Sequence, residues 1–600
     1  MTDLIPSIQT AAVEAIAELY GKDVPVDEIV LQETKKEFEG DFTLVVFPLM
    51  RYKLGGGPPQ VGEALGQALQ ARLPFIEGYN VIKGFLNLSI RSDWWQQFLG
   101  HLQGRPDFYR LNLGQGQSVV VEYCSPNTNK PLHLGHLRNI ILGYALSRIL
   151  EASGYQVHET CLYNDRGTNI SKSMYAWLQA GKQETPEMAG VKGDKLVGDY
   201  YVAFSRQYAA EVGELIAKGL TKAEAEKAAP SMQAVHEMTV RWEAGDEAVR
   251  DLWRKMNQWV YTAFADTFAK LGVKFERFYY ESQVYQRGKE TVAEGLEKGV
   301  FYQEEDGSVV VDLTDDGLDK KVLLRSNGTS LYITQDLAIA EDKFESYQMD
   351  RSIYVVGNEQ DYHFKVLFKI LEKLGKPYAE GLYHLSYGMV DLPSGKMKSR
   401  EGTTVEADDL MAEMIEQAAR ETQKLGKTEG MDEAELQALY RTLGIGALKY
   451  YLVKVDPRKR MLFDPNESID LHGQTAPFIQ SSYTRTVSIG RKAEAAGMDL
   501  VYHPDQTLET PMLEVERSLL RMIFRYPQVL QEAANGYNPA LLANYAYDLA
   551  KEYNRFYHEA PVLRREQPQT SAFRFALSTQ VGQTLKEALA LLGIEMPERM

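Results

Sequence analysis

Two histidines that stand where a predicted strand gives way to a predicted helix are the first residues here that suggest chemistry. They belong to the run Pro131-Leu132-His133-Leu134-Gly135-His136. The first turn of a helix offers unpaired N–H groups and a partial positive charge, so a phosphate is well placed there. Both imidazoles could hydrogen-bond an α-phosphate as negative charge grows on it during displacement. Gly135 would let a flat adenine ring approach the backbone.

The histidine motif has two other interpretations when it is taken alone. An ordinary capped helix with two incidental histidines fits the same residues. So does a zinc pair, although only Cys124 and Cys161 could complete it. The sequence around the motif therefore has to decide among the three.

A second candidate is a loop dense in cations much further along the chain. It reads Gly395-Lys396-Met397-Lys398-Ser399-Arg400-Glu401-Gly402. Such a loop could neutralise the β- and γ-phosphates of a leaving pyrophosphate. Alone it would equally be a solvated surface loop. The two motifs in this order and at this separation are far more specific than either alone.

The chain that must position these groups has the composition of a large folded protein. Of its 600 residues, 44% are hydrophobic and 25% are charged, which excludes a largely disordered chain. It has no apolar run long enough to span a membrane and no secretory leader pattern. Its two cysteines exclude a disulfide scaffold and a Cys₄ zinc site, and they fit a reducing cytoplasm. The net charge of −17 argues against generic nucleic-acid binding, although a basic stripe on one face stays compatible with it.

A strand–helix–strand pattern surrounds the histidine motif and predicts a parallel sheet. The strands are expected at 118–123 and 157–163, and the helix from Gly135 to about 153. Residues 168–275 are helical and charged, which indicates an insertion. Strand-like runs then return at 309–311, 331–333 and 353–356, followed by a helix at 363–374. This interrupted pattern predicts a Rossmann-like nucleotide-binding fold.

The segments on either side of this fold differ from it in pattern. Residues 79–90 read as a strand pair broken at Gly84, after a helical start at 8–19. From about Ala407 the chain is almost continuously helical. We therefore expect a multidomain protein with an N-terminal α+β module at 1–110, a Rossmann-like α/β catalytic domain with helical insertions at 115–405, and a C-terminal all-α bundle at 406–600. The main insertion is expected at about 168–275.

The paired motifs resemble the signatures of class I aminoacyl-tRNA synthetases, and their flanks narrow the resemblance to the arginyl-tRNA synthetases. Glu122-Tyr123-Cys124-Ser125-Pro126-Asn127-Thr128-Asn129-Lys130-Pro131 looks like the segment that precedes the first motif in that family. Further similarity runs through residues 242–246, 332–336, 357–363 and 591–600. The resemblance implies ATP-dependent activation of L-arginine to arginyl-adenylate and transfer to the 3′ end of tRNA(Arg). It also implies an anticodon-binding role for the C-terminal bundle.

The resemblance assigns a set of residues to the arginine pocket, namely Glu122, Asn127, Tyr332, Asp336 and Gln360. A guanidinium favours planar charged acceptors, which carboxylates supply. Two buried acids without a basic partner would be costly unless a cationic ligand bound them. A lysine ligand would satisfy two acids as well. Glu122 could also be a solvent-facing strand residue, and Asp336, after an expected strand, a helix N-cap.

The resemblance places ATP on the other side of the same site. It assigns ATP binding to His133, Gly135, His136, Asn358, His363 and Lys396, and Mg²⁺ to the phosphates; no zinc or other resident metal is expected. The family's usual loop reads Lys-Met-Ser-Lys, whereas residues 396–399 read Lys-Met-Lys-Ser. A lysine ahead of the first motif is thought to compensate in such cases, and Lys130 occupies that place. Whether Lys130, Lys396 or Lys398 meets the pyrophosphate stays open.

The tRNA contacts are also carried over from the resemblance. Phe85 and Asn87 match candidates for a D-loop base, and Asn554, Tyr557 and Met600 lie by analogy near the anticodon. Phe556, at helical spacing from other aromatics, is expected in a bundle core. Ser481 and Tyr483 replace the aromatic and histidine usual at their positions, so contacts carried over there are in doubt. The basic runs 458–460 and 564–565 are interpreted as solvated faces.

Other functions fit the sequence less well than this one. Another class I synthetase is disfavoured, because a cysteinyl enzyme needs zinc ligands and a glutamyl pocket needs basic residues. A smaller nucleotidyltransferase would not need the C-terminal bundle. A catalytically silent, tRNA-binding paralogue would lose the histidines or the loop lysines, and both are present. A cytoplasmic monomer without a membrane partner is expected.

Overall fold

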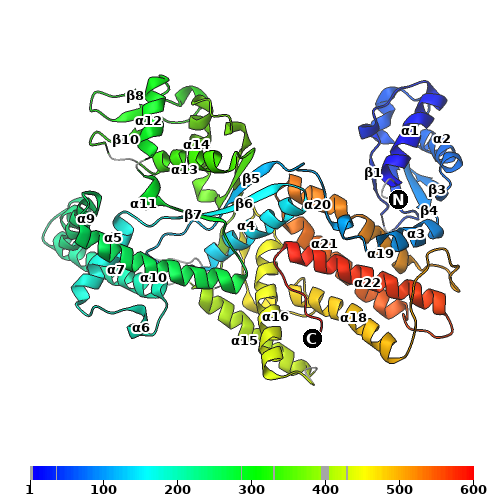
Figure 1. Cartoon of the computed structure of the whole chain (residues 1–600). Coiled ribbons are helices and arrows are strands. Elements are labelled where there is room, and N and C mark those ends of the chain that lie inside the picture. Colours follow the sequence, from blue (N-terminus) through cyan, green and yellow to red (C-terminus); the bar gives the residue numbers. More distant parts are fainter. Residues whose placement is uncertain (1–3, 36, 286, 329–330, 394–404, 427–429) are drawn as a thin grey trace.

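The computed structural model describes residues 4–600 except 36, 286, 329–330, 394–404 and 427–429. An N-terminal module, a domain built on a parallel sheet and a C-terminal helical bundle follow one another along the chain (Figure 1). This is the multidomain α/β plus all-α architecture that the sequence predicts.

The N-terminal module is a four-stranded antiparallel sheet with three helices. The strand order is β1-β2-β4-β3. Its elements are α1 (Leu4–Tyr20), β1 (Leu31–Glu33), β2 (Phe42–Val45), α2 (Pro58–Arg72), β3 (Ile76–Ile82), β4 (Phe85–Ile90) and α3 (Ser92–Leu102). The expected strand pair at 79–90 is confirmed as β3 and β4. Lys83 and Gly84 connect the strands with φ of 55° and 92°, the left-handed pair that a tight hairpin turn requires.

The central sheet has five parallel strands in the order β12-β11-β5-β6-β7. The strands are β5 (Ser118–Glu122), β6 (Gln156–Tyr163), β7 (Arg277–Tyr280), β11 (Arg351–Gly357) and β12 (Leu382–Tyr387). The predicted β5–helix–β6 unit is confirmed, with α4 (Leu134–Ala152) as its helix. Gly143 allows α4 to pack closely on the end of β5, because a Cβ there would lie 2.3 Å from the Tyr123 ring.

The helical insertion between β6 and β7 is also present. It comprises α5 (Thr168–Ala180), α6 (Pro186–Ala189), α7 (Gly193–Ala217), α8 (Lys222–Ala228), α9 (Pro230–Glu243) and α10 (Glu247–Leu271). The sheet resumes directly afterwards with β7, whose aromatic run was not recognised as a strand. The insertion packs back on the motif segment, since a Cβ on Gly198 of α7 would lie 2.6 Å from Pro131.

Two of the strand-like runs after the insertion do not belong to the parallel sheet. Residues 309–311 form β9 (Val309–Val311) of a separate antiparallel sheet with β8 (Tyr302–Gln303) and β10 (Lys321–Leu324), which follows α11 (Glu281–Val284) and α12 (Gly288–Glu297) in the chain. The strand expected at 331–333 is wrong, because Tyr332 begins the helix α13 (Tyr332–Tyr347). Buried Leu337 and Ala340 continue the apolar pattern of Ile333 at helical spacing. A three-residue apolar run cannot distinguish the two structures.

The C-terminal part is a helical bundle, as expected. After α14 (Asp361–Lys373), its helices are α15 (Ala407–Leu425), α16 (Glu433–Val453), α17 (Pro465–Ser468), α18 (Ala476–Ala495), α19 (Glu514–Phe524), α20 (Tyr526–Asn535), α21 (Ala540–Glu559) and α22 (Pro568–Leu591). Phe556 is fully buried, which confirms its place in the core. A short parallel pair, β13 (Val390–Asp391) with β14 (Met461–Leu462), joins the bundle to the sheet domain. Within the parts that the structure describes, no helix is long and apolar enough to cross a membrane.

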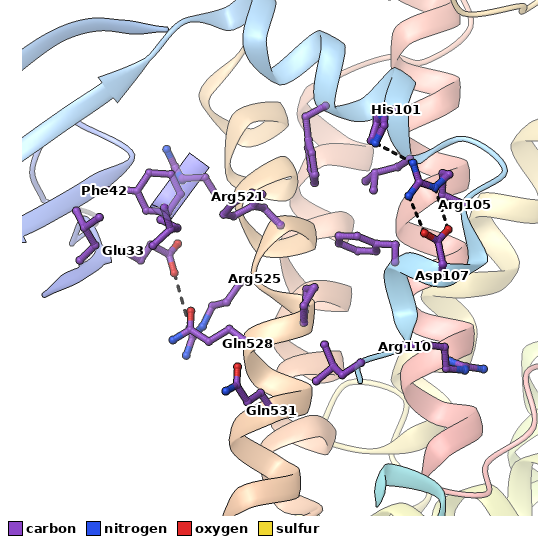
Figure 2. A pocket seen from close by; sticks show the side chains of 18 of the residues that line it. Glu33, Phe42, His101, Arg105, Asp107, Arg110, Arg521, Arg525, Gln528 and Gln531 are labelled. Carbon is purple, nitrogen blue, oxygen red and sulfur yellow. Dashed lines mark hydrogen bonds and ion pairs between the residues drawn. The ribbon is translucent and has the colours of Figure 1, made fainter. Parts of the chain in front are cut away.

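The N-terminal module rests on the bundle around a cavity of about 920 Å³ (Figure 2). Its floor is aromatic, with Phe42 and Phe98 packed edge-on against Phe524 at centroid distances of 5.8 and 5.4 Å. Glu33 of the module and Arg525 of the bundle approach to 3.8 Å across one side. This contact joins the two ends of the chain without involving the central sheet.

A buried aspartate holds this interface. Asp41, only 1% exposed, accepts hydrogen bonds from Arg521 Nη1 at 2.7 Å, Arg517 Nη1 at 3.2 Å and the Ile90 N–H at 2.7 Å. Burial would lower the pKa of Arg521, but Asp41 and Glu514 outweigh it and raise that pKa. Both arginines belong to α19, so one carboxylate fixes the module to the bundle.

Replacing Asp41 with asparagine is expected to loosen this docking, because two partly buried guanidinium groups would face a neutral amide. Losing one partner of a buried charge cluster costs about 3 kcal/mol or more. Calorimetry should show the first unfolding transition at a lower temperature. Asp93→Asn is the matched control, since its pair with Arg91 is more than half exposed and should contribute less than about 1 kcal/mol. Equal shifts in the two variants would contradict the expectation.

Candidate active site

The predicted ATP- and arginine-binding residues that the structure describes lie where the connections of the parallel sheet change direction. From β5 the chain crosses through α4 to β6, and from β11 it crosses through α14 to β12 on the other side. The carboxyl ends of β5 and β11 therefore border a crevice, which is where ligands bind in open α/β sheets. Glu122 ends β5, and residues 358–360 follow β11.

Asn139 of α4 bridges the two strands at this crevice. Its Oδ1 accepts a hydrogen bond from the Cys124 N–H at 2.6 Å, and its Nδ2 donates to the Val355 carbonyl at 2.7 Å. Cys124 has a φ of 56°, so the chain turns sharply out of β5 at this point. Sequence reasoning missed Asn139. The feature that could have indicated it is a polar residue on a helix face that is otherwise apolar.

The two histidines form a defined pair at the start of α4. His133 Nδ1 accepts a hydrogen bond from the Gly135 N–H at 3.1 Å, and His136 Nδ1 accepts one from the His133 N–H at 3.1 Å. Their ring centroids are 3.9 Å apart. Because each Nδ1 is an acceptor, each neutral ring carries its hydrogen on Nε2. Both rings are thus donors through Nε2.

Burial keeps these rings neutral. It lowers the pKa of His133 to about 3, with Lys130 adding to the shift, and it lowers the pKa of His136 well below its usual range. Gly135 is needed beside them for a reason that sequence reasoning did not give. A Cβ there would lie 3.0 Å from His133 Cε1, so a larger residue would displace that ring.

The segment that follows the cation-dense loop is anchored beside the histidines. Lys396 and Lys398 lie outside the described residues. The segment that follows them is hydrogen-bonded to the motif, through the Ala407 N–H to the Leu132 carbonyl at 2.8 Å and the Leu134 N–H to the Val405 carbonyl at 3.3 Å. Lys130 is partly buried in the same region, and burial lowers its pKa. The fold therefore brings residues 405–407, which follow the loop in the chain, to the first motif.

Both acids of the predicted arginine pocket already have a basic neighbour, contrary to the sequence argument that they have none. Glu122 is 5% exposed and its Oε2 lies 2.6 Å from Lys343 Nζ. Asp336 Oδ2 lies 2.6 Å from His363 Nε2. Glu122 is thus not solvent-facing, and Asp336 lies within α13 rather than at its N-cap. Lys343 comes from a distant part of the chain, which is why the local sequence did not reveal it.

The other residues predicted to bind arginine lie on accessible parts of the same region. Tyr332, the first residue of α13, is 68% exposed. Asn358 and Gln360 are exposed in the single turn after β11. Asn127 pairs through its backbone with Asn164 at the end of β6. His363, expected on the ATP side, contacts the acid expected to bind arginine.

Sequence reasoning missed a third acid near this group. Glu281 begins α11 directly after β7 and is 6% exposed. Burial raises its pKa to about 7, opposed by Arg166. Gln335 donates a hydrogen bond to it, and Asp336 is close enough to raise its pKa further. The position of Glu281 directly after a parallel strand would mark it as a candidate site residue, but only if β7 had been predicted as a strand.

The predicted tRNA contacts have different surroundings. Phe85 is half-buried against Phe47, whereas Asn87 is 1% exposed and hydrogen-bonded to Thr43 and Asn80 at 2.7 and 2.8 Å. Asn554 bonds Arg485 and Ser482, and the same Arg485 lies over the Tyr557 ring. Met600 is half-buried against the bundle. Asn87 therefore supports the sheet, and its side chain is less accessible than that of Phe85.

Comparison with known proteins agrees with this architecture. Residues 104–464 match the family model described as the class I (R) tRNA synthetase catalytic domain, and residues 479–600 match the DALR anticodon binding domain. Curated arginine–tRNA ligases of Bacteroides fragilis and Parabacteroides distasonis are each 51% identical, covering 98 and 99% of this chain and 99% of their own length.

Solved structures share the fold across the full chain. The arginyl-tRNA synthetase of Thermus thermophilus superimposes with a TM-score of 0.78 at 24% identity, and covers 100% of both chains. That of Plasmodium falciparum gives a TM-score of 0.75 at 20% identity, over 100% of this chain and 99% of its own. With half of its residues identical to the curated relatives over nearly its whole length, the chain belongs to the class I arginyl-tRNA synthetase family.

Proposed function

We propose that this chain activates L-arginine with ATP to arginyl-adenylate and transfers it to the 3′ end of tRNA(Arg), releasing pyrophosphate and AMP. One observation carries the proposal beyond family membership. Two neutral histidines present Nε2–H donors at the switch point of the sheet, where Glu122 ends β5 and Asp336 of α13 contacts His363 of α14. The site thus combines donors for a phosphate with acceptors for a cationic amino acid.

In the first step the arginine carboxylate attacks the α-phosphorus of ATP, and the bond from that phosphorus to the bridging oxygen of pyrophosphate breaks. His133 and His136 stabilise the charge that grows on the α-phosphate through their Nε2–H groups. Gly135 leaves space for the adenine, and Asn358 and His363 border the nucleotide side. Mg²⁺ would enter with ATP, held largely by the phosphate oxygens, where it neutralises charge on the leaving pyrophosphate. Lys130, Lys396 and Lys398 are the candidate cations for that pyrophosphate.

Arginine selection falls to a second set of residues around the same crevice. Asp336 and Glu122 accept hydrogen bonds from its cationic groups. Asn127, Tyr332 and Gln360 would complete the pocket from accessible positions. In the second step a hydroxyl of the terminal ribose attacks the carbonyl carbon of the adenylate, and AMP leaves.

The ends of the chain would hold the tRNA. We assign residues 1–110 to the elbow, with Phe85 and Asn87 as candidates for a D-loop base. We assign the bundle at 406–600 to the anticodon, with Asn554, Tyr557 and Met600 nearby; residues 115–405 are the catalytic domain. We also propose that the protein acts as a cytoplasmic monomer.

ATP–pyrophosphate exchange with each of the twenty amino acids, with and without tRNA, tests the proposal. Exchange with arginine alone is expected, and it should depend on tRNA. Tight tRNA binding without exchange for any amino acid would instead favour a catalytically silent paralogue. Exchange with lysine would mean that the two acids do not by themselves select a guanidinium.

A further inference from the structure

A fully buried lysine lies under the proposed arginine pocket. The side chain of Lys343 is 0% exposed, and its Nζ lies 2.6 Å from Glu122 Oε2 and 4.1 Å from the centroid of the Tyr354 ring. Burial alone would lower the pKa of Lys343, but Glu122 and Tyr354 outweigh it, and the pKa is raised. Lys343 is therefore an ammonium paired with a carboxylate inside the protein.

The helix α13 carries this lysine and an acid of the pocket together. Asp336 and Lys343 are two helical turns apart, so they lie on the same side of α13. Asp336 contacts His363, and Lys343 contacts Glu122 at the end of β5. A single helix thus fixes the positions of both acids relative to each other.

The two oxygens of Glu122 have different surroundings. Oε2 is next to Lys343, whereas the hydrogen bond that the described residues give to Oε1 is a long one, from Ser125 Oγ at 3.4 Å. The titratable groups of the sheet that interact with Glu122 are Tyr354 on β11 and Cys161 on β6, the two adjacent strands, and Tyr279 on β7, which lies beyond β6. Burial raises the pKa of each of these groups, so they are neutral in the physiological range. Among the residues that the structure describes, Lys343 is thus the charged partner recorded for Glu122.

We propose that Lys343 is a positioning residue for arginine recognition, which fixes the Glu122 carboxylate through Oε2 and leaves Oε1 to a cationic group of the substrate. The inference rests on the proposed arginine activity. A buried carboxylate without a partner is costly, and it relieves the cost by moving or by binding a proton. Either response would remove the acceptor that arginine needs. Lys343 thus acts on the substrate through Glu122 and does not touch it.

Lys343→Met tests this role in the full-length enzyme with tRNA present. The KM for arginine should rise about 30-fold at pH 7, as expected when one partner of a buried charge pair is truncated. The KM values for ATP and tRNA should change little. The increase should be larger at pH 6 and smaller at pH 8.5, because a lone buried carboxylate must lose a proton before it can accept arginine. Lys343→Arg should restore most of the affinity, since it retains the charge.

Lys449→Met is the matched control for losing a buried lysine. Lys449 is 7% exposed and donates to the carbonyls of Leu271 and Gly593, at the junction of α10, α16 and the C-terminal segment. This variant should leave the KM for arginine and its pH dependence unchanged. A double-mutant cycle adds the decisive comparison. In a Glu122→Gln background, Lys343→Met should cause little further loss, because its effect passes through Glu122.

Three results would overturn the inference: an unchanged or lower KM for arginine in Lys343→Met, an equal rise in all three KM values, or a full additional loss in the Glu122→Gln background. Failure of the proposed function is a separate result. It would show first, as a wild-type enzyme that does not charge tRNA with arginine.

Discussion

Replacing His136 with asparagine is expected to slow arginine-dependent ATP–pyrophosphate exchange about 100- to 1,000-fold, the usual cost of removing one preorganised donor from a developing negative charge. Asparagine retains an acceptor near the position of Nδ1, so the hydrogen bond from the His133 N–H can persist. It has no donor as far out as Nε2. The loss should therefore appear in kcat, with little change in the KM for arginine.

Glutamine at the same position separates the donor from the rest of the ring. Its longer side chain can place an N–H near the Nε2 position, so His136→Gln should be clearly more active than His136→Asn. Thermal unfolding of both variants controls for damage to the start of α4. Equal activities in the two variants would show that the Nε2–H donor is not what accelerates the reaction.

The protonation state of the histidine pair gives an independent check. Burial lowers the pKa of His133 to about 3 and that of His136 well below its usual range. Both rings should therefore stay neutral as the pH falls from 8 to 6, through the region where a free histidine gains a proton. Over this pH range, protonation of the pair should therefore not slow exchange by the wild-type enzyme. The pH profiles of the wild type and of His136→Asn should have the same shape.

The parts of this site that local sequence determines could be predicted, and those made by distant contacts could not. The apolar run of β5 and the long periodic pattern of α4 indicate these two elements from local sequence alone. The histidine motif was therefore placed correctly at their junction. The short run at 331–333 carries no such information, and its assignment as a strand was wrong. α13 owes its start to burial of Ile333 and Leu337 in the folded domain.

The partners of the two acids illustrate the same limit. Lys343 meets Glu122 only because α13 packs on the end of β5, and no spacing in the sequence encodes that contact. Asn139 likewise gains its role only when β5 and β11 become neighbours. The sequence therefore indicated candidate residues for the chemistry, while the groups that hold those residues in place depend on the tertiary fold.

Asp336 offers the sharpest test of the amino-acid side, because its recorded partner is the imidazole of His363 rather than a lysine or an arginine. Asp336→Asn should raise the KM for arginine about 100-fold in aminoacylation, since a charge-assisted acceptor is replaced by an amide that is partly a donor. The KM for ATP should change little. Steady-state charging of tRNA with varied arginine measures both values.

A second aspartate on the same helix provides the control for this prediction. Asp342 is paired with Arg277 of β7 and with Arg287, neither of which is assigned to the arginine pocket. Asp342→Asn removes a carboxylate from α13 without altering the acceptors proposed for arginine, so its KM for arginine should stay near that of the wild type. If Asp342→Asn raised this KM as much as Asp336→Asn, the effect would reflect a general displacement of α13. If Asp336→Asn raised the KM for ATP instead, Asp336 and His363 would belong to the nucleotide side, and Glu122 would remain the acid that recognises arginine.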